Sequence, residues 1–159
     1  MKITIISVGK IKEKFYRDAI AEYEKRLSRY CKFQIIEVAD EKTPDKASET
    51  EEQQIKEKEA DRILAHVKED ACLVTLEIQG KKLDSIGFSE FIGQKTVHGV
   101  SHIQFVIGGS LGIHEKISKI SNFKLSFSDM TFPHQLMRVI LVEQIYRAFR
   151  IMTGEPYHK

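Results

Sequence analysis

A run of glycines after an apolar segment is the first place where residue types and spacing suggest chemistry. Residues 105–107 are apolar and lead into Gly108-Gly109-Ser110-Leu111-Gly112. Because glycine has no side chain, Gly108 and Gly109 leave backbone amides open to a ligand, and a side chain at position 108 is expected to fill the space that the ligand needs. Ligands of open α/β sheets bind outside the carboxyl ends of the strands. The run therefore predicts a binding site at the end of a strand.

A polar turn follows the next apolar segment. Residues 123–127 lead into Ser128-Asp129-Met130-Thr131-Phe132-Pro133, which offers hydroxyl, carboxylate and main-chain groups. Loops that follow parallel strands meet at the same edge of a sheet. We therefore expect this turn and the glycine run to line one cofactor pocket.

The same residues match other known patterns less well. The glycine run fits G-x-S-x-G, and Asp129 and His134 follow in the order Ser, Asp, His of a hydrolase. Only a turn and a helix start separate Asp129 from His134, so no independent loops orient the pair, and a serine hydrolase is disfavoured. The glycines form no G-x-G-x-x-G and no P-loop lysine follows them, which disfavours the usual dinucleotide and nucleoside triphosphate sites.

Two lysine-rich segments also follow predicted strands. Gly9-Lys10-Ile11-Lys12-Glu13-Lys14 comes after the first strand and Gly80-Lys81-Lys82 after the third. Both segments are expected at the edge of the sheet that carries the pocket. Their ammonium groups could hold phosphates, and the alternative of solvated surface lysines stays open.

The C-terminal segment combines an aromatic ring, an imidazole and a cation in Gly154-Glu155-Pro156-Tyr157-His158-Lys159. A frayed end is the default for such a segment. The proline and the aromatic ring favour instead a tail that docks over the pocket.

Composition predicts one ordinary globular domain over residues 1–159. The formal net charge of +2 is too small to predict nucleic-acid binding from bulk charge, although acidic residues concentrate between positions 40 and 70 and leave room for a basic patch elsewhere. No apolar run approaches the length of a transmembrane helix or a signal peptide. We expect a cytoplasmic protein without membrane contact.

Cysteine and histidine spacing predicts no metal site. Cys31 and Cys72 lie far apart and form no C-x-x-C, which is typical of free thiols in a reducing compartment. His98 and His102 are four positions apart, but Gly99 between them argues against one helical face.

Strand and helix patterns alternate along the whole chain. The predicted strands are 3–8, 33–38, 72–78, 103–107 and 123–127, and the predicted helices are 13–30, 48–67, 85–97, 113–120 and 133–152. Such alternation with apolar strands predicts an α/β fold, a mainly parallel sheet covered by helices on both faces.

The last predicted helix is apolar nearly all round, with Leu136, Val139, Ile140 and Val142 pointing in different directions. A helix of this kind is buried on more than one side. In so small a protein, one face would pack on the sheet and the other would meet a second subunit. Arg138 lies within an apolar stripe, so it needs a partner or a ligand unless its head reaches the helix end.

Taken together, these segments resemble the family of ribosomal RNA large subunit methyltransferase H, within the SPOUT superfamily. The resemblance extends over the whole length of the chain. The motifs that carry it are Ile3 to Lys12, Phe105 to Gly112, Leu125 to Arg138, Glu143 to Ala148 and Pro156 to Lys159.

The resemblance implies a fold and an activity that spacing alone does not predict. It implies a C-terminal trefoil knot, a rare exception to unknotted chains. It also implies S-adenosylmethionine bound in the knot, a homodimer paired through the last helix, and methylation of the N3 atom of a pseudouridine in 23S rRNA. The substrate would be the RNA itself, the large subunit or the assembled ribosome. A non-catalytic RNA- or ribosome-binding module of the same fold is the alternative.

The resemblance also implies residue roles. The cofactor contacts would be Leu76, Gly108, Phe127, Ser128, Asp129, Met130, Thr131 and Phe132. Catalysis needs donor and acceptor to be aligned and the N3 proton to be removed. Glu143 and His158 are the candidates for that proton, and Arg147 and Tyr157 would hold the nucleotide by charge and by stacking.

Overall fold

Five parallel strands form one sheet in the computed structural model, which describes residues 1–159. The strands are β1 (Lys2–Val8), β2 (Lys32–Val38), β3 (Cys72–Lys82), β4 (His102–Ile107) and β5 (Phe123–Ser126), in the order β2-β1-β4-β3-β5. All neighbouring pairs are parallel, which confirms the predicted sheet. Every residue of β4 is buried, as expected for a central parallel strand covered on both faces.

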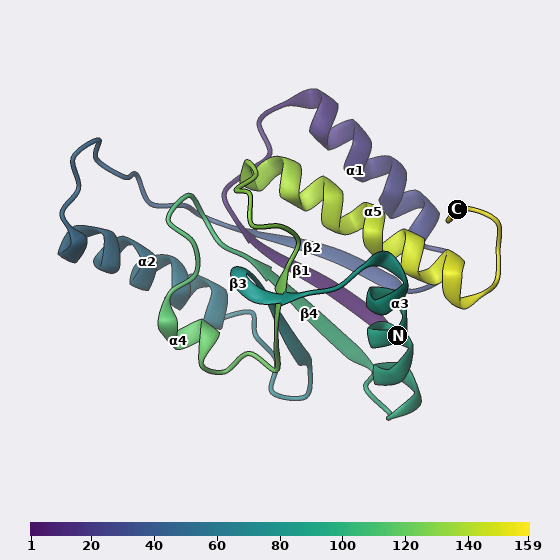
Figure 1. Cartoon of the computed structure of the whole chain (residues 1–159). Coiled ribbons are helices and arrows are strands. Elements are labelled where there is room, and N and C mark those ends of the chain that lie inside the picture. Colours follow the sequence, from purple (N-terminus) through teal and green to yellow (C-terminus); the bar gives the residue numbers. More distant parts are fainter.

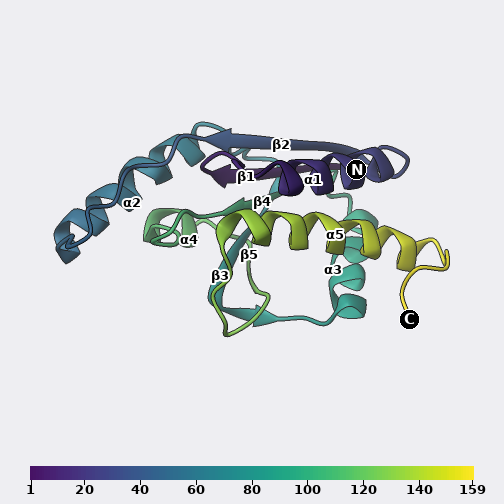
Figure 2. The same ribbon diagram turned by 90° about the horizontal axis from the view of Figure 1, so that it is seen from above.

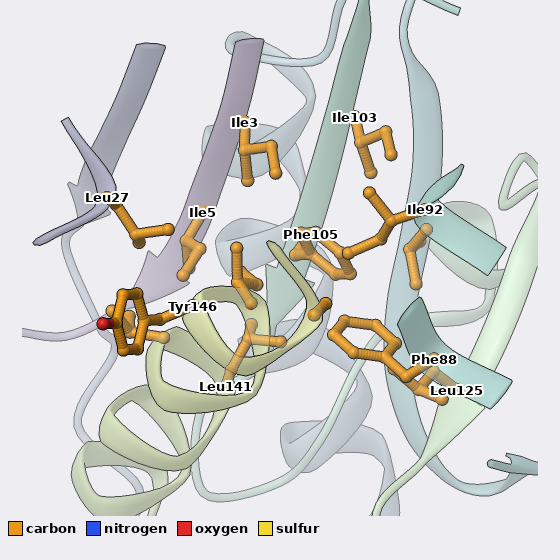
Figure 3. Close-up of a cluster of buried hydrophobic side chains, with 14 of the residues drawn as sticks. Ile3, Ile5, Leu27, Phe88, Ile92, Ile103, Phe105, Leu125, Leu141 and Tyr146 are labelled. Carbon is orange, nitrogen blue, oxygen red and sulfur yellow. The ribbon is translucent and has the colours of Figure 1, made fainter. Parts of the chain in front are cut away.

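Helices cover both faces of the sheet (Figures 1 and 2). They are α1 (Lys14–Leu27), α2 (Glu49–Leu64), α3 (Ser85–Val97), α4 (Glu115–Ser118) and α5 (His134–Met152). The helices α1, α3 and α5 share one face and its larger apolar core, whereas α2 and α4 cover a smaller core on the other. Figure 3 shows Leu141 and Tyr146 of α5 projecting into the larger core beside Ile5 and Phe105. None of these helices has the length and apolarity needed to cross a bilayer.

Most predicted elements are present, with ends that differ by one to three residues. The predicted helix start is confirmed, because the Ser48 hydroxyl accepts a hydrogen bond from the Glu51 amide (3.2 Å). The Glu51 carboxylate accepts from the Ser48 hydroxyl (3.2 Å) and not from its backbone amide, so only half of a capping box is formed. The predicted helix 13–30 ends at Leu27, and the predicted helix 113–120 has only four residues.

The predicted end of the third strand was wrong, because β3 continues through Gly80 to Lys82. Residues 77–80 leave the ladder, and Leu125 of β5 pairs with both Leu76 and Lys81. A Cβ at Gly80 would lie 2.7 Å from the Lys124 backbone. The glycine therefore permits a close crossing of two strands, although glycines more often end a strand.

Arg138 of α5 has the partner that its place in an apolar stripe requires. Its side chain is 1% exposed, and its Nη1 donates to Glu37 Oε2 of β2 (2.5 Å). Its Nη2 donates to the Gly9 carbonyl (3.0 Å). Burial lowers the pKa of Arg138, and the bond to Glu37 opposes this shift. The head group is thus held inside the protein and does not reach out along the helix.

The predicted all-round burial of α5 is only partly present within one chain. Leu141, Val142 and Ile145 are buried, whereas Leu136, Val139 and Ile140 are half-buried. Val142 belongs to the core that α5 forms with the sheet. The stripe of α5 that stays half-buried in one chain therefore contains Leu136, Val139 and Ile140.

Candidate active site

A cavity of about 280 Å³ lies at the carboxyl ends of β4 and β5, beside the point where β3 leaves the ladder at residues 76–78. Its walls come from the loop after β4, the turn between β5 and α5, and the first turn of α5. Seven of the eight residues that the resemblance assigns to a cofactor line it: Leu76, Gly108, Phe127, Ser128, Met130, Thr131 and Phe132. The two loops expected to share one pocket do so.

Asp129 is the exception among the eight. It does not line the cavity, and its carboxylate accepts a hydrogen bond from Lys82 Nζ (2.6 Å) at the surface. The side chain is 80% exposed. In this arrangement Asp129 joins the turn to the end of β3, and any contact it makes with a ligand would come from its backbone.

Gly108 is needed for a different reason from the one predicted. A Cβ there would lie 2.8 Å from the Gly112 backbone and 2.9 Å from Ile113 Cγ1. Real Cβ atoms do not approach a backbone so closely, so the loop would have to move. The expectation that a side chain at 108 would project into the ligand space was wrong, because it would instead push apart the turn that forms the cavity wall.

Glu77 is a cavity residue that sequence reasoning missed. Its carboxylate accepts hydrogen bonds from Thr75 Oγ1 (2.6 Å) and Ser118 Oγ (2.9 and 3.1 Å). No basic side chain pairs with it, so the wall carries one uncompensated negative charge. An acidic residue immediately after Leu76, at a predicted strand end, was the available signal.

His134 also lines the cavity and was considered only as part of a hydrolase triad. Its Nδ1 is buried without a hydrogen-bond partner. Burial lowers the pKa of His134, and the nearby Arg138 charge lowers it further. No triad exists, because the Asp129 carboxylate is bonded to Lys82 and not to this imidazole. The rejection of a serine hydrolase stands on this geometry.

The four proposed catalytic residues form one cluster at the other end of α5. Glu143 Oε1 accepts from Arg147 Nε (3.0 Å), Arg147 Nη2 (2.6 Å) and the Tyr157 hydroxyl (3.0 Å). The Arg147 guanidinium lies 4.7 Å from the centre of the Tyr157 ring, and its Nη1 lies 3.2 Å from His158 Nδ1. The hydrogen bond with Glu143 raises the pKa of Arg147, whereas burial is the main cause that raises the pKa of Tyr157.

The tail is docked, but it does not lie over the cavity of its own chain. Glu155 accepts from Tyr30 (2.8 Å) and Arg150 (2.5 Å), and Arg150 also donates to the Pro156 carbonyl (3.0 Å). The tail therefore packs against the ends of α1 and α5. Figure 1 shows the amino end of α5 beside the strand-end loops and the C terminus beyond its opposite end. Ten residues of helix, about 15 Å, separate Met137 in the cavity wall from Arg147.

No group of three or more histidine, cysteine or acidic side chains is arranged to hold a metal ion. His98 Nδ1 is bonded to the Gln94 carbonyl (2.7 Å), and His102 Nε2 to Thr4 Oγ1 (2.9 Å). Cys31 and Cys72 are free thiols, as predicted.

The fold and the cavity define an α/β protein with a cavity at the carboxyl ends of β4 and β5, and comparisons with known proteins identify its family. A family model described as "Predicted SPOUT methyltransferase" matches residues 1–158. The chain belongs to the SPOUT methyltransferase family, and this membership implies the trefoil knot.

Similar proteins cover the whole chain and are themselves covered completely. The chain is 62% identical over 159 residues to the ribosomal RNA large subunit methyltransferase H of Clostridium tetani and 61% identical to that of Bifidobacterium adolescentis. It is 64% identical to a protein of Methanococcus maripaludis named putative ribosomal RNA large subunit methyltransferase H.

Proposed function

We propose that this protein transfers a methyl group from S-adenosylmethionine to the N3 atom of a pseudouridine in 23S ribosomal RNA. The observation that carries the proposal is the convergence of seven expected cofactor residues on one cavity, in a chain about 62% identical over its full length to proteins named for this RNA substrate. The open cavity favours an enzyme over a non-catalytic binding module, whose pocket has no need to stay accessible.

The residues around the cavity suit S-adenosylmethionine. Its volume is near the lower end of the range for small-molecule sites. Phe127 and Phe132 offer apolar walls for an adenine ring, and the turns at Gly108 and Ser128 bring backbone groups to the wall. Glu77 supplies a negative charge for a ligand that carries a net positive one. When bound, this cofactor supplies a methyl group that its sulfonium already activates.

The Glu77 charge gives a direct test of the cofactor. S-Adenosylmethionine is a cation and S-adenosylhomocysteine is neutral overall, so Glu77→Gln should weaken the first on the order of tenfold (about 1.4 kcal/mol) and the second much less. Calorimetric titration of both ligands measures this ratio. Glu90→Gln, on an exposed site of α3, is the control. Equal losses for both ligands would mean that Glu77 does not face the charged part of the cofactor.

The C-terminal cluster can hold the target nucleotide. Arginine has no acceptor, so the contact between Arg147 Nη1 and His158 Nδ1 requires that the imidazole accept. A neutral His158 then carries its proton on Nε2, suited to donate to a carbonyl oxygen of the base. Glu143 already accepts four hydrogen bonds, from Arg147, Tyr157 and Gln144, and so orients these groups. Arg147 and Tyr157 would bind the nucleotide, and His158 takes up the N3 proton once Arg147 turns to the RNA.

A homodimer would bring the two sites together. In one chain the cavity lies at the amino end of α5, whereas the cluster lies along its carboxyl half and the tail, so Arg147 and His158 do not line the cavity. The half-buried stripe of Leu136, Val139 and Ile140 runs between them and is apolar enough to meet a second copy. We propose that two chains pair through this stripe, so that the cluster of one completes the cavity of the other.

Mass spectrometry of 23S rRNA from cells with and without the gene tests the proposed reaction. We expect one N3-methylated pseudouridine to be lost with the gene and restored by the wild-type protein. Methylation in vitro of naked 23S rRNA, large subunits and assembled ribosomes, with labelled S-adenosylmethionine, then identifies the substrate among cytoplasmic forms of this RNA. Unchanged rRNA in the deletion strain would contradict the proposal.

A further inference from the structure

We propose that the loop Gly9–Lys12 is a preformed contact for the RNA sugar-phosphate backbone, and that the ion pair between the buried Arg138 and the exposed Glu37 holds this loop in shape. The inference rests on the proposed function in one respect, because it takes RNA as the substrate. It adds a docking surface and a role for this ion pair.

The backbone of the loop is held almost entirely by side chains from other elements. The Ile11 amide donates to Glu37 Oε2 (3.1 Å), and the Lys12 amide donates to Gln135 Oε1 (3.1 Å). Arg17 of α1 donates to the carbonyls of Ile11 (3.3 Å) and Lys12 (2.7 Å). Strand, helix and helix end thus fix four consecutive backbone groups of an exposed loop.

Arg138 completes this frame from inside the protein. It donates to the Gly9 carbonyl at the start of the loop and to the same Glu37 that accepts from the loop amide. Its Nε is buried without a partner. Arg138 is buried, whereas the Glu37 side chain is 38% exposed. An apolar residue of similar size would fill the place of Arg138 without the cost of removing a charge from water. Core packing alone therefore does not account for Arg138, whereas support of an exposed loop does.

The loop is continuous with the candidate active site. His134 lines both the cavity at the strand ends and an adjacent hollow, whose wall contains Gly9, Lys10 and Lys12 together with the acidic residues Glu37 and Asp40. The imidazole lies 3.3 Å from where a Cβ of Gly9 would be, so the two regions touch. An RNA that brings its base to the cavity passes this loop.

Lys10 and Lys12 are the charges that the loop presents. Both side chains are exposed, and neither forms an ion pair, whereas Lys14 nearby is bonded to Asp18 (2.7 Å). A rigid loop loses little conformational entropy when it binds, so its lysines can contribute more affinity than lysines on a mobile segment. Phosphates of a nucleic acid are recognised mainly through their charge, without a strict requirement for spacing. Two ammonium groups outside any ion pair, on a fixed backbone, suit this kind of recognition.

The double variant Lys10→Ala/Lys12→Ala tests the contact. Its binding to ribosomes isolated from cells without this gene should depend less on salt, with the slope of log K against log salt reduced by about 1.5 for two lost phosphate contacts. The KM for these ribosomes should rise severalfold while kcat and the affinity for S-adenosylmethionine stay at wild-type values. Lys68→Ala, exposed at the opposite edge of the sheet, should change none of these.

Each other outcome has a defined meaning. A wild-type slope and KM in the double variant would overturn the loop contact while leaving the methyltransferase intact. Loss of S-adenosylmethionine affinity would also overturn it, because the lysines would then serve the cofactor. A wild-type protein that methylates no ribosomal particle and no 23S rRNA would contradict the proposed function itself.

Glu37→Gln tests the role of the ion pair between Arg138 and Glu37. Glutamine keeps one oxygen acceptor but lacks the charge that faces Arg138, so we expect the KM for ribosomes to rise with kcat unchanged. Urea unfolding measured alongside separates this from general damage. Reduced stability with a wild-type KM and salt slope would show that the pair is structural only.

Discussion

The two ends of α5 differ in the kinds of residues that surround them. At the amino end, the cavity is formed by turns of small residues and apolar rings, with Glu77 as its one unpaired charge. At the carboxyl end, Glu143, Arg147 and Tyr157 form a dense network of ionic hydrogen bonds. A cofactor with an apolar ring and a net positive charge suits the first, and a polar nucleotide with phosphates suits the second.

The difference also concerns tolerance to change. The shape of the amino end depends on backbone positions such as Gly108, where a side chain would not fit. The carboxyl end depends instead on the functional groups of its side chains. Substitutions at the amino end should therefore change cofactor binding and folding. Substitutions at the carboxyl end should change RNA methylation and leave cofactor binding and folding nearly unchanged.

The largest effect is expected from Gly108→Ala. The added Cβ would overlap the Gly112 backbone at 2.8 Å, so the loop must shift and the cavity wall with it. We expect no measurable S-adenosylmethionine binding by calorimetry and a lower melting temperature. Gly99→Ala is the control, because nothing lies within 4 Å of a new Cβ there and its cost is limited to the left-handed backbone of Gly99 (φ +82°), which Gly108 does not share. If both variants bind cofactor equally, the close packing of this loop is unimportant.

A large effect confined to the reaction is expected from His158→Ala. The side chain is exposed and contacts only Arg147, so stability and S-adenosylmethionine affinity should hardly change. Loss of general acid-base help typically costs about 10²–10⁴-fold in rate. Single-turnover methylation of ribosomes measures the loss. A rate within a few-fold of wild type would remove His158 from the catalytic residues.

The dimer prediction compares two neighbouring apolar residues of α5. Ile140→Asp changes the half-buried stripe, and sedimentation should show dissociation into folded monomers with at least a tenfold loss of methylation. Val142→Asp places a charge in the core of the single chain and should prevent folding, at a cost of several kcal/mol. A wild-type protein that sediments as an active monomer would contradict this arrangement.

Much of the fold could be predicted because its strands are continuous apolar segments separated by helices with clear caps. Ser48 and Glu51 predicted a helix start that the structure confirms. The extension of β3 past Gly80 could not be predicted, since a glycine ends most strands and here instead permits a close crossing with β5. The tertiary fold determines which segment passes close to Gly80, and no local sequence pattern predicts that segment.

The parts of the site that are formed by backbone turns could be predicted from the sequence. The parts that depend on side chains from distant segments could not. The glycine run and the Ser128 turn pointed to the cavity through their residue types alone. Glu77 was missed because its role depends on Thr75 and Ser118, and Ser118 lies 41 residues away. The position of the tail was misjudged for the same reason, because Tyr30 and Arg150 hold it at the far end of α5.

The smallest expected effect is a pH dependence of stability to which His134, at the amino end of α5, and His102 of β4 contribute. Burial lowers the pKa of both His134 and His102 in the folded protein. For His134, the charges of Arg138 and Lys12 add to this, and Asp40 opposes it. A histidine with a lowered folded pKa binds fewer protons in the folded than in the unfolded state. Its neutral form is stable above the unfolded pKa of about 6.5, and stability is lost as the pH falls below that value.

We therefore expect the free energy of unfolding, measured in urea, to be lower at pH 5.5 than at pH 7.5. His134→Asn should reduce this difference, and His102→Asn should reduce it independently, because the two histidines lie in separate parts of the fold and their effects should add. The amino end of α5 would then be the end whose stability is more sensitive to acid, since His134 forms part of the cavity wall there. An unchanged difference in the double variant would show that the acid sensitivity arises from other groups.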